Sequence, residues 1–143
     1  MNSQASSMDV KEDNQPTPDG ELALKLIPNR SDTNAHGDIS GGWVVAHMDH
    51  AAESVASRIA HGRIANVALE SVVFLSPIRI GAAVCFYTKL LDIGSSSIRI
   101  GIEVWTQNPN EKARRKVVDA IFVYVAIDES GRIRKVPRWF DTA

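Results

Sequence analysis

The chain has 143 residues, a formal net charge of −1, 44% hydrophobic and 23% charged residues, and a single cysteine. This composition is that of an ordinary globular protein, and it gives no electrostatic reason to expect nucleic acid or an anionic membrane as a partner. The one cysteine excludes an intramolecular disulfide. Cys85 lies in an apolar run, which predicts a buried, unreactive thiol.

Residues 1–20 are polar, acidic and proline-bearing, with neither an apolar signal-peptide core nor an arginine-rich amphipathic pattern. This composition predicts a disordered N-terminal tail over 1–20, followed by one domain over 21–143. No run of about 18 apolar residues occurs in the sequence, so no membrane-spanning helix is expected. A cytoplasmic location is the simplest expectation.

Residues 21–27 alternate leucines with polar or small neighbours before Pro28, which predicts a short strand with one apolar face. From Trp43 onward, apolar residues recur at helical spacing, which predicts one long helix packed along its whole length. Gly62 is the expected residue just beyond its C-terminus. The apolar stripe of this helix consists of Val44, Val45, Met48, Ala51, Ala52, Val55, Ala56, Ile59 and Ala60.

Beyond the helix, the apolar residues recur with a period of about two, as in strands. Four strands are predicted, over 66–74, 84–93, 98–104 and 117–127. The alternating set in the last of them is Val117, Asp119, Ile121, Val123, Val125 and Ile127. One helix and about five strands favour an antiparallel sheet that curls around the helix. A single helix cannot cover both faces of such a sheet, so at least a dimer is expected.

The loop before the helix reads SDTNAHGDISGGW, residues 31–43, and combines polar side chains with three glycines. A glycine-rich loop that opens a helix presents unpaired N–H groups, which bind anions or stabilise an oxyanion. Asp38 could act as a base there or only cap the helix. Asn34 could contact a substrate or form an Asx-turn, and His36 is expected to be solvated.

The order of elements and the local motifs together resemble the hotdog fold and, within it, the YciA-like acyl-CoA thioesterases. The matching segments are PNRSDTNAHGDISGGWVVAHMDHAA (28–52), VALESVVFLSPIRIG (67–81), GSSSIRIGIEVW (94–105) and FVYVAIDESGRIRKVP (122–137). The resemblance implies an α+β hotdog domain over 21–143, with a five-stranded antiparallel sheet wrapped around one long central helix. It also implies hydrolysis of a small-molecule acyl-CoA substrate in a homo-oligomer, a dimer or a trimer of dimers, with active sites between protomers.

The same resemblance suggests roles for particular residues. Asp38 is the expected catalytic carboxylate, as general base or nucleophile, the amide of Gly42 contributes to the oxyanion hole, and Asn34 contacts water or the thioester carbonyl. No separate cofactor is implied, because CoA is part of the substrate. The expected walls of the CoA groove are Phe74, Leu75, Ser76, Pro77, Ser95 and Ser96, and the candidate cations for its phosphates are Arg79, Lys89, Arg114, Arg115 and Lys116.

Three further points concern chemistry. Ser40 stands where the relatives favour a phenylalanine, which predicts either a changed acyl pocket or a helix-capping serine. Asp49 lies near the apolar stripe and is expected to satisfy a buried donor, with catalysis as its reserve role. His47 and His50 lie on the polar flank of the helix, and no metal site is predicted there.

Two other functions stay open. The first is a dehydratase or hydratase of acyl thioesters, which would use His36 and Asp38 to move protons. The second is a non-catalytic acyl-CoA-binding module that keeps the pocket of the fold.

Overall fold

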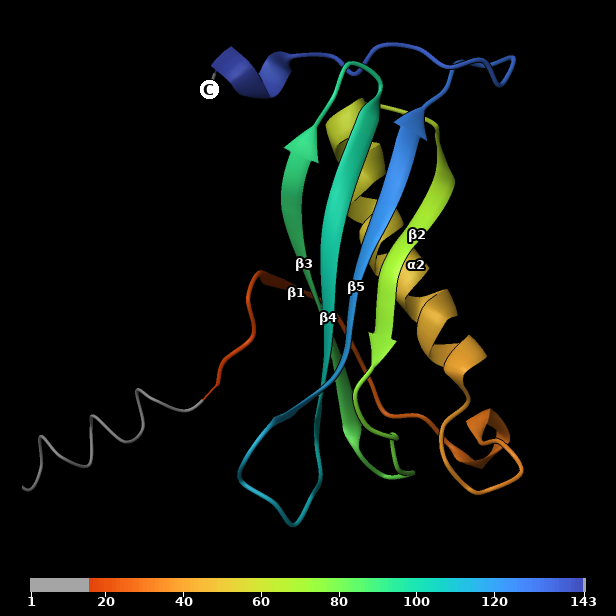
Figure 1. Ribbon diagram of the computed structural model, residues 1–143, viewed down its shortest axis with the longest axis vertical. Coiled ribbons are helices and arrows are strands. Elements are labelled where there is room, and N and C mark those ends of the chain that lie inside the picture. The colour runs from red at the N-terminus through yellow and green to blue at the C-terminus, as the bar shows by residue number, and fades with distance from the viewer. Residues whose placement is uncertain (1–15, 143) are drawn as a thin grey trace, which may run out of the picture.

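The computed structural model describes residues 16–142 as one five-stranded sheet and one long helix (Figure 1). In chain order the elements are β1 (Glu21–Leu26), the 3-10 turn η1 (Arg30–Asp32), α2 (Gly41–Ala60), β2 (Ile64–Phe74), β3 (Ala83–Ile93), β4 (Ser97–Gln107), β5 (Arg115–Ala126) and the 3-10 turn η2 (Trp139–Thr142). The predicted α+β hotdog architecture is confirmed.

The sheet has the order β1-β3-β4-β5-β2, and every neighbouring pair is antiparallel. Three residues join β3 to β4, and a longer loop of seven residues joins β4 to β5. The chain instead crosses from β2, at one edge, to β3 on the other side of β4 and β5 (Figure 1). The outer edge of β2 is therefore unpaired within residues 16–142.

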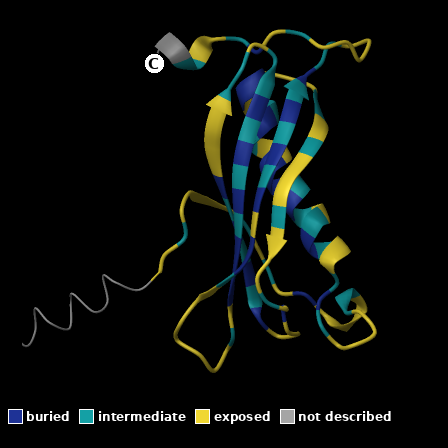
Figure 2. Cartoon of the chain, viewed as in Figure 1, coloured by how far each residue is buried: buried dark blue, intermediate teal, exposed yellow. Residues whose placement is uncertain are grey.

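Helix α2 packs lengthwise across one face of the sheet, which lies in front of it in Figure 1. Seven of the nine residues of the predicted apolar stripe are buried, and Val45 and Val55 are partly buried. On β4 the predicted alternating residues, Ile98 to Val104, are all buried. The core is therefore the interface between the helix stripe and the central strands, as the dark blue in Figure 2 shows.

The strand predicted over 117–127 is confirmed as β5, but the alternating set that was noted for it is not the face that enters the core. The residues that enter the core are Val118, Ala120, Phe122, Tyr124 and Ala126, whereas the predicted alternating set, apart from Val117, is half-buried or exposed. Both faces of this strand carry apolar side chains, but α2 covers only one of them. Periodicity alone could not choose between the two faces.

Both ends of α2 are capped. At the N-terminus the Ser40 hydroxyl accepts the Trp43 N–H at 3.1 Å, so the capping alternative for Ser40 is confirmed. At the C-terminus the left-handed residue is His61, with φ of 53°, and the expectation that Gly62 has this role is wrong. Arg134 and Trp139 donate to the carbonyls of Ala60 and Ile59, at 2.8 and 3.0 Å.

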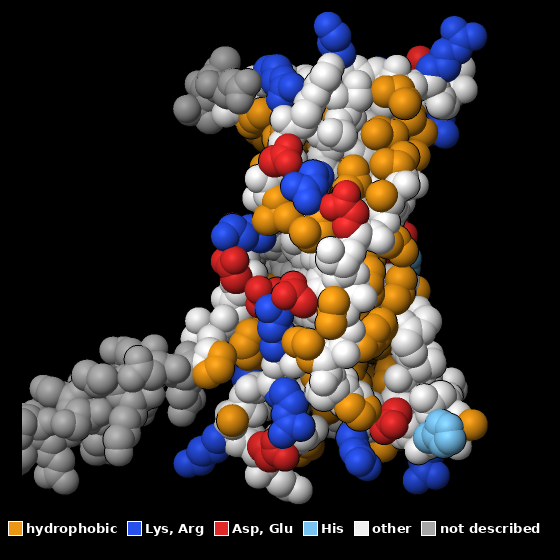
Figure 3. All heavy atoms as spheres, viewed as in Figure 1, with side chains coloured by type: hydrophobic (Ala, Val, Ile, Leu, Met, Phe, Trp, Pro, Cys, Tyr) orange, Lys and Arg blue, Asp and Glu red, His pale blue; other side chains and the backbone are white. Residues whose placement is uncertain are grey.

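The outer face of the sheet, turned to the viewer in Figure 3, mixes hydrophobic and charged side chains. Cys85 belongs to this face and is partly exposed, so the prediction of a fully buried thiol is wrong. Of the predicted tail, residues 1–15 lie outside the described residues. Asp19 is described and pairs with Lys89 at 3.0 Å. Over residues 16–142, no helix has the length and hydropathy needed to cross a membrane.

Candidate active site

The loop before α2 is held by its own backbone and side chains. The Asn34 carboxamide oxygen accepts the N–H groups of His36 and Asp38, at 2.8 and 3.2 Å. This is the geometry of an Asx-turn, the structural alternative for Asn34. The Asp38 carbonyl accepts the Asn34 N–H at 2.7 Å, and Ile39 donates to Ile78 at 2.8 Å. The loop is thus attached to the segment between β2 and β3.

Asp38 lies just before the capped helix. Its backbone forms an isolated β-bridge with Arg79. Its carboxylate is partly exposed and makes no hydrogen bond or ion pair within residues 16–142. The carboxylate is available for chemistry, but no neighbouring side chain orients it.

Gly41 and Gly42 form the first turn of α2. N–H groups of the first helical turn have no intrahelical acceptor, and the positive end of the helix dipole adds to their attraction for an oxyanion. A Cβ at Gly42 would meet nothing within 4 Å. The fold of one protomer therefore leaves open space on the Cα side of this residue.

A second carboxylate, Asp49, lies further along α2 and is firmly oriented. Its Oδ1 accepts the Tyr124 hydroxyl at 2.6 Å and the Asn66 carboxamide N–H at 3.3 Å. Its Oδ2 has no partner among the described residues. Asp49 does satisfy a buried donor, since Tyr124 is 1% exposed. Burial and the bond to Asp49 raise the pKa of Tyr124, so the phenol keeps its proton and donates it.

Tyr124 and Asn66 had no predicted role in the site. The signal for Tyr124 was a tyrosine in a strand that packs on the helix, because a buried phenol needs a hydrogen-bond partner. Asn66 lies on β2, next to the strand that carries Tyr124. Its contact with α2 follows from the pairing of β2 with β5, which the sequence does not reveal.

The predicted walls of the CoA groove fall into two groups. Phe74 packs against the start of α2, because a Cβ on Gly41 would lie 3.6 Å from its ring. Leu75 donates to Val117 at 2.7 Å and is half exposed. The Ser76 hydroxyl is buried with no hydrogen-bond partner in the described part of the chain. Pro77 lines a polar hollow beside it.

Ser95 and Ser96 form the second group, in the turn between β3 and β4. Their carbonyls accept the N–H groups of Val136 and Ala126, both at 2.9 Å. This turn lies at the opposite end of the sheet from Phe74 (Figure 1). Strands of 11 residues separate the two ends by about 35 Å. One protomer therefore does not bring the two groups together.

His47 and His50 lie on one flank of α2, with ring centroids 5.9 Å apart. His47 Nδ1 lies 2.8 Å from the Trp43 carbonyl, and its ring centroid lies 4.3 Å from that of Trp43. Over residues 16–142, no group of three or more His, Cys, Asp or Glu side chains is placed to hold a metal ion.

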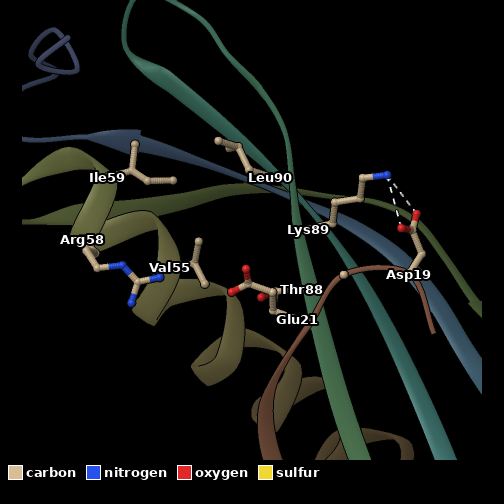
Figure 4. A pocket seen from close by; sticks show the side chains of 9 residues that line it. Asp19, Glu21, Val55, Arg58, Ile59, Thr88, Lys89 and Leu90 are labelled. Atoms are coloured by element: carbon tan, nitrogen blue, oxygen red, sulfur yellow. Dashed lines mark hydrogen bonds and ion pairs between the residues drawn. The ribbon is translucent and has the colours of Figure 1, made fainter. Parts of the chain in front are cut away.

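The hollow in Figure 4 lies beside the C-terminal half of α2, where Asp19 and Lys89 form their ion pair. Arg58, Val55 and Ile59 of α2 and Thr88 of β3 also line it, and its volume is about 360 Å³. Of the residues predicted for the site, it contains Lys89, a candidate cation, but none of the predicted catalytic residues or CoA-groove walls.

Comparison with known proteins points to one family. The sequence pattern of the thioesterase superfamily matches residues 36–113, which include the three glycines of the loop, Asp49 and the Phe74–Pro77 segment. An uncharacterized acyl-CoA thioester hydrolase of Haemophilus influenzae is 45% identical over 122 residues, 83% of this chain and 79% of the relative. The acyl-CoA thioester hydrolase YciA of Salmonella typhimurium is 42% identical, with 85% and 93% of the two chains covered.

Solved structures agree with this comparison. The crystal structure of HI0827, described as a hexameric broad specificity acyl-coenzyme A thioesterase, gives a TM-score of 0.82 at 42% identity, over 90% of this chain and 89% of that one. The hexameric thioesterase y2039 from Yersinia pestis gives 0.80 at 40% identity, over 85% and 98%. The fold is thus shared with acyl-CoA thioesterases over most of the length of this chain.

Proposed function

Because this chain belongs to the thioesterase superfamily, among the YciA acyl-CoA thioester hydrolases, we propose that it hydrolyses acyl-CoA thioesters to a carboxylic acid and CoA. Water attacks the thioester carbonyl, the carbon–sulfur bond breaks, and the proton that leaves the water ends on the CoA sulfur. The reaction needs a base near the water and donors for the developing oxyanion.

The observation that carries the mechanism is the asymmetric environment of Asp49. Its Oδ1 is held by Tyr124 and Asn66, and its Oδ2 is free among the described residues. A base must be held in place while one oxygen stays available for the proton. We therefore assign the general base to Asp49, and the amides of Gly41 and Gly42 to the oxyanion hole.

Asp38 remains the alternative base. It lies closer to the glycine pair in sequence, but no side chain of the described part orients its carboxylate. Asn34 supports the loop in this proposal, since its carboxamide oxygen already accepts two backbone N–H groups. The dehydratase alternative needs a histidine near Asp38, and no hydrogen bond joins the side chains of His36 and Asp38.

The positions on α2 imply that two protomers share each site. Gly42 and Asp49 are seven residues apart in one continuous helix, which separates them by about 10 Å along its axis. One carbonyl cannot contact both, so the amides that act with Asp49 must come from another protomer. Such a site agrees with the hexameric relatives and with the unpaired edge of β2, which carries exposed Val67, Leu69 and Val73.

The test compares two isosteric variants, Asp49→Asn and Asp38→Asn. Release of free CoA from palmitoyl-CoA should fall by about 10²-fold or more in Asp49→Asn, the range for a lost acid–base catalyst. Asp38→Asn should keep most of the activity. If Asp38→Asn loses more activity than Asp49→Asn and both variants keep the wild-type thermal midpoint, the general base is Asp38.

Two controls separate the other functions. If the wild-type protein hydrates crotonyl-CoA and releases no CoA from palmitoyl-CoA, its function is that of a hydratase. If it binds acyl-CoA and catalyses neither reaction, it is a binding module.

We also propose a cytoplasmic location, where acyl-CoA is formed and used, and cell fractionation tests it directly.

A further inference from the structure

A polar hollow of about 430 Å³ lies at the end of the sheet where α2 begins. Two guanidinium groups against one carboxylate give it an excess of positive charge. The residues that line it are Pro77, Arg79, Thr106, Asn108, Glu111 and Arg115. In Figure 3 several Lys and Arg side chains gather at this end of the molecule.

The strand register shows which face of the sheet the hollow occupies. Val84 of β3 lies opposite Thr106 of β4, and Thr106 lies opposite Arg115 of β5. Residues directly opposite each other in an antiparallel pair project to the same face. Val84 is buried in the core under α2, so Arg115 projects to the helix side of the sheet. Arg79 arrives there through its bridge with Asp38.

Both arginines of the hollow are free to bind an anion. Among the other candidate cations, Lys89 pairs with Asp19 at 3.0 Å, and Lys116 pairs with Asp119 at 2.9 Å. Arg79 and Arg115 form no ion pair or side-chain hydrogen bond within residues 16–142. Arg114 does not line the hollow.

The hollow lies near the start of α2, because Arg79, which lines it, forms a backbone bridge with Asp38 in the loop before the helix. The Phe74 ring lies beside Gly41, and Pro77 lines the hollow. Arg79 follows Phe74 by five residues, which an extended chain spans in at most about 18 Å. Between them is the buried Ser76 hydroxyl, which lacks a partner in the described part of the chain. A ligand with a thioester at one end and phosphates at the other can therefore contact both places.

We propose that this hollow binds the phosphate groups of the acyl-CoA substrate, with Arg79 and Arg115 donating charge-assisted hydrogen bonds to the phosphate oxygens. The inference rests on the proposed function, because the thioester substrate supplies the phosphates. Glu111 lowers the affinity of the hollow for an anion. The three charges together therefore set how tightly substrate binds and how readily CoA leaves.

The first experiment measures steady-state hydrolysis by Arg79→Gln and Arg115→Gln with two substrates. Acyl-CoA carries the phosphates, whereas the matching S-acyl-pantetheine has the same thioester and no phosphate. Each variant should raise KM for acyl-CoA about tenfold, the effect of one lost charged hydrogen bond, and should change kcat less than about twofold. KM for S-acyl-pantetheine should not change.

Two matched variants sharpen this test. Glu111→Gln should lower KM for acyl-CoA, opposite in sign to the arginine variants. Arg58→Gln removes one positive charge from the separate hollow of Figure 4 and should leave both substrates unaffected. Equal changes for acyl-CoA and S-acyl-pantetheine, or an equal effect of Arg58→Gln, would overturn the assignment.

Binding measurements keep the inference separate from catalysis. Calorimetry with adenosine 3′,5′-bisphosphate, the nucleotide end of CoA without its pyrophosphate arm, should show binding that both arginine variants weaken. Unchanged binding in both variants would refute the phosphate site even if hydrolysis is found. Inorganic phosphate that binds more tightly than the nucleotide would assign the hollow to free phosphate and overturn the substrate role. Loss of hydrolysis in every protein, with arginine-dependent nucleotide binding retained, would refute only the proposed function.

Discussion

Complementation between two inactive variants tests whether one active site takes residues from two protomers. Asp49→Asn removes the proposed base, and Gly42→Ala places a methyl group beside the proposed oxyanion donor. The added Cβ meets nothing within 4 Å in one protomer, and alanine is a better helix former than glycine. Gly42→Ala should therefore be more stable than the wild type by about 0.5 to 1 kcal/mol.

The expected recovery follows from the geometry of α2. Gly42 and Asp49 are seven positions apart on the helix, which places the two groups about 10 Å apart in one protomer, too far to act on the same carbonyl. In a mixed dimer with two-fold symmetry, one site combines both substitutions and the other combines none. Random association makes half of the dimers mixed, each with one intact site of two. About a quarter of the wild-type rate should return.

The assay is release of free CoA, measured before and after the two variants are unfolded and refolded together. Asp49→Asn alone should retain about 1% or less of the activity, and Gly42→Ala alone about 10% or less. Simple mixing without exchange should give the average of the two, roughly 5%. If the refolded mixture also stays at that average, both groups act within one protomer, and the shared site is refuted.

Three further predictions concern contacts described above. The raised pKa of Tyr124 means that the folded chain keeps a proton that the unfolded chain loses above about pH 10, so the free energy of unfolding should fall as pH rises past that value. Urea titrations between about pH 9 and 11 should show a smaller fall in Tyr124→Phe, and an equal fall would contradict the assignment. Arg134→Ala should lower the free energy of unfolding by about 1.5 to 3 kcal/mol, because it removes donors to Ala60 and Ile127; Arg132→Ala, an exposed neighbour, is the control. Ser40→Ala should cost about 1 kcal/mol of stability and Ser40→Gly only a few tenths, and equal losses in thermal melts would show that the capping hydroxyl is not the cause.

Much of the fold followed from local patterns. Helix α2 was predictable because nine apolar residues recur at helical spacing between a capping serine and a glycine. The strands were predictable in number and nearly in extent, since alternation and turn residues act over a few neighbouring positions. The glycine pair at the start of the helix was identified on the same local grounds. All of these features depend on interactions between residues that are close in sequence.

The sequence alone also determined the family, through the loop motif and the strand segments that resemble the acyl-CoA thioesterases. It favoured Asp38 over Asp49 as the base, because the resemblance was applied to the loop motif and Asp38 lies beside the glycines of that motif. Whether a carboxylate is oriented depends on neighbours from other elements. In this chain those neighbours, Tyr124 and Asn66, come from two strands far away in sequence.

Only the tertiary structure decided the strand order and its consequences. The pairing of β2 with β5 brings Asn66 and Tyr124 to Asp49, and it leaves β2 with an open edge. The face of β5 that enters the core was also decided by packing, because both of its faces are apolar and only one is covered by α2. Likewise, the two arginines of the polar hollow are 36 positions apart in sequence. They meet because the chain crosses from β2 to β3 at the end of the sheet where the β4–β5 hairpin turns. Non-local pairing of this kind leaves no period in the sequence, since it depends on which surfaces bury one another when the chain folds.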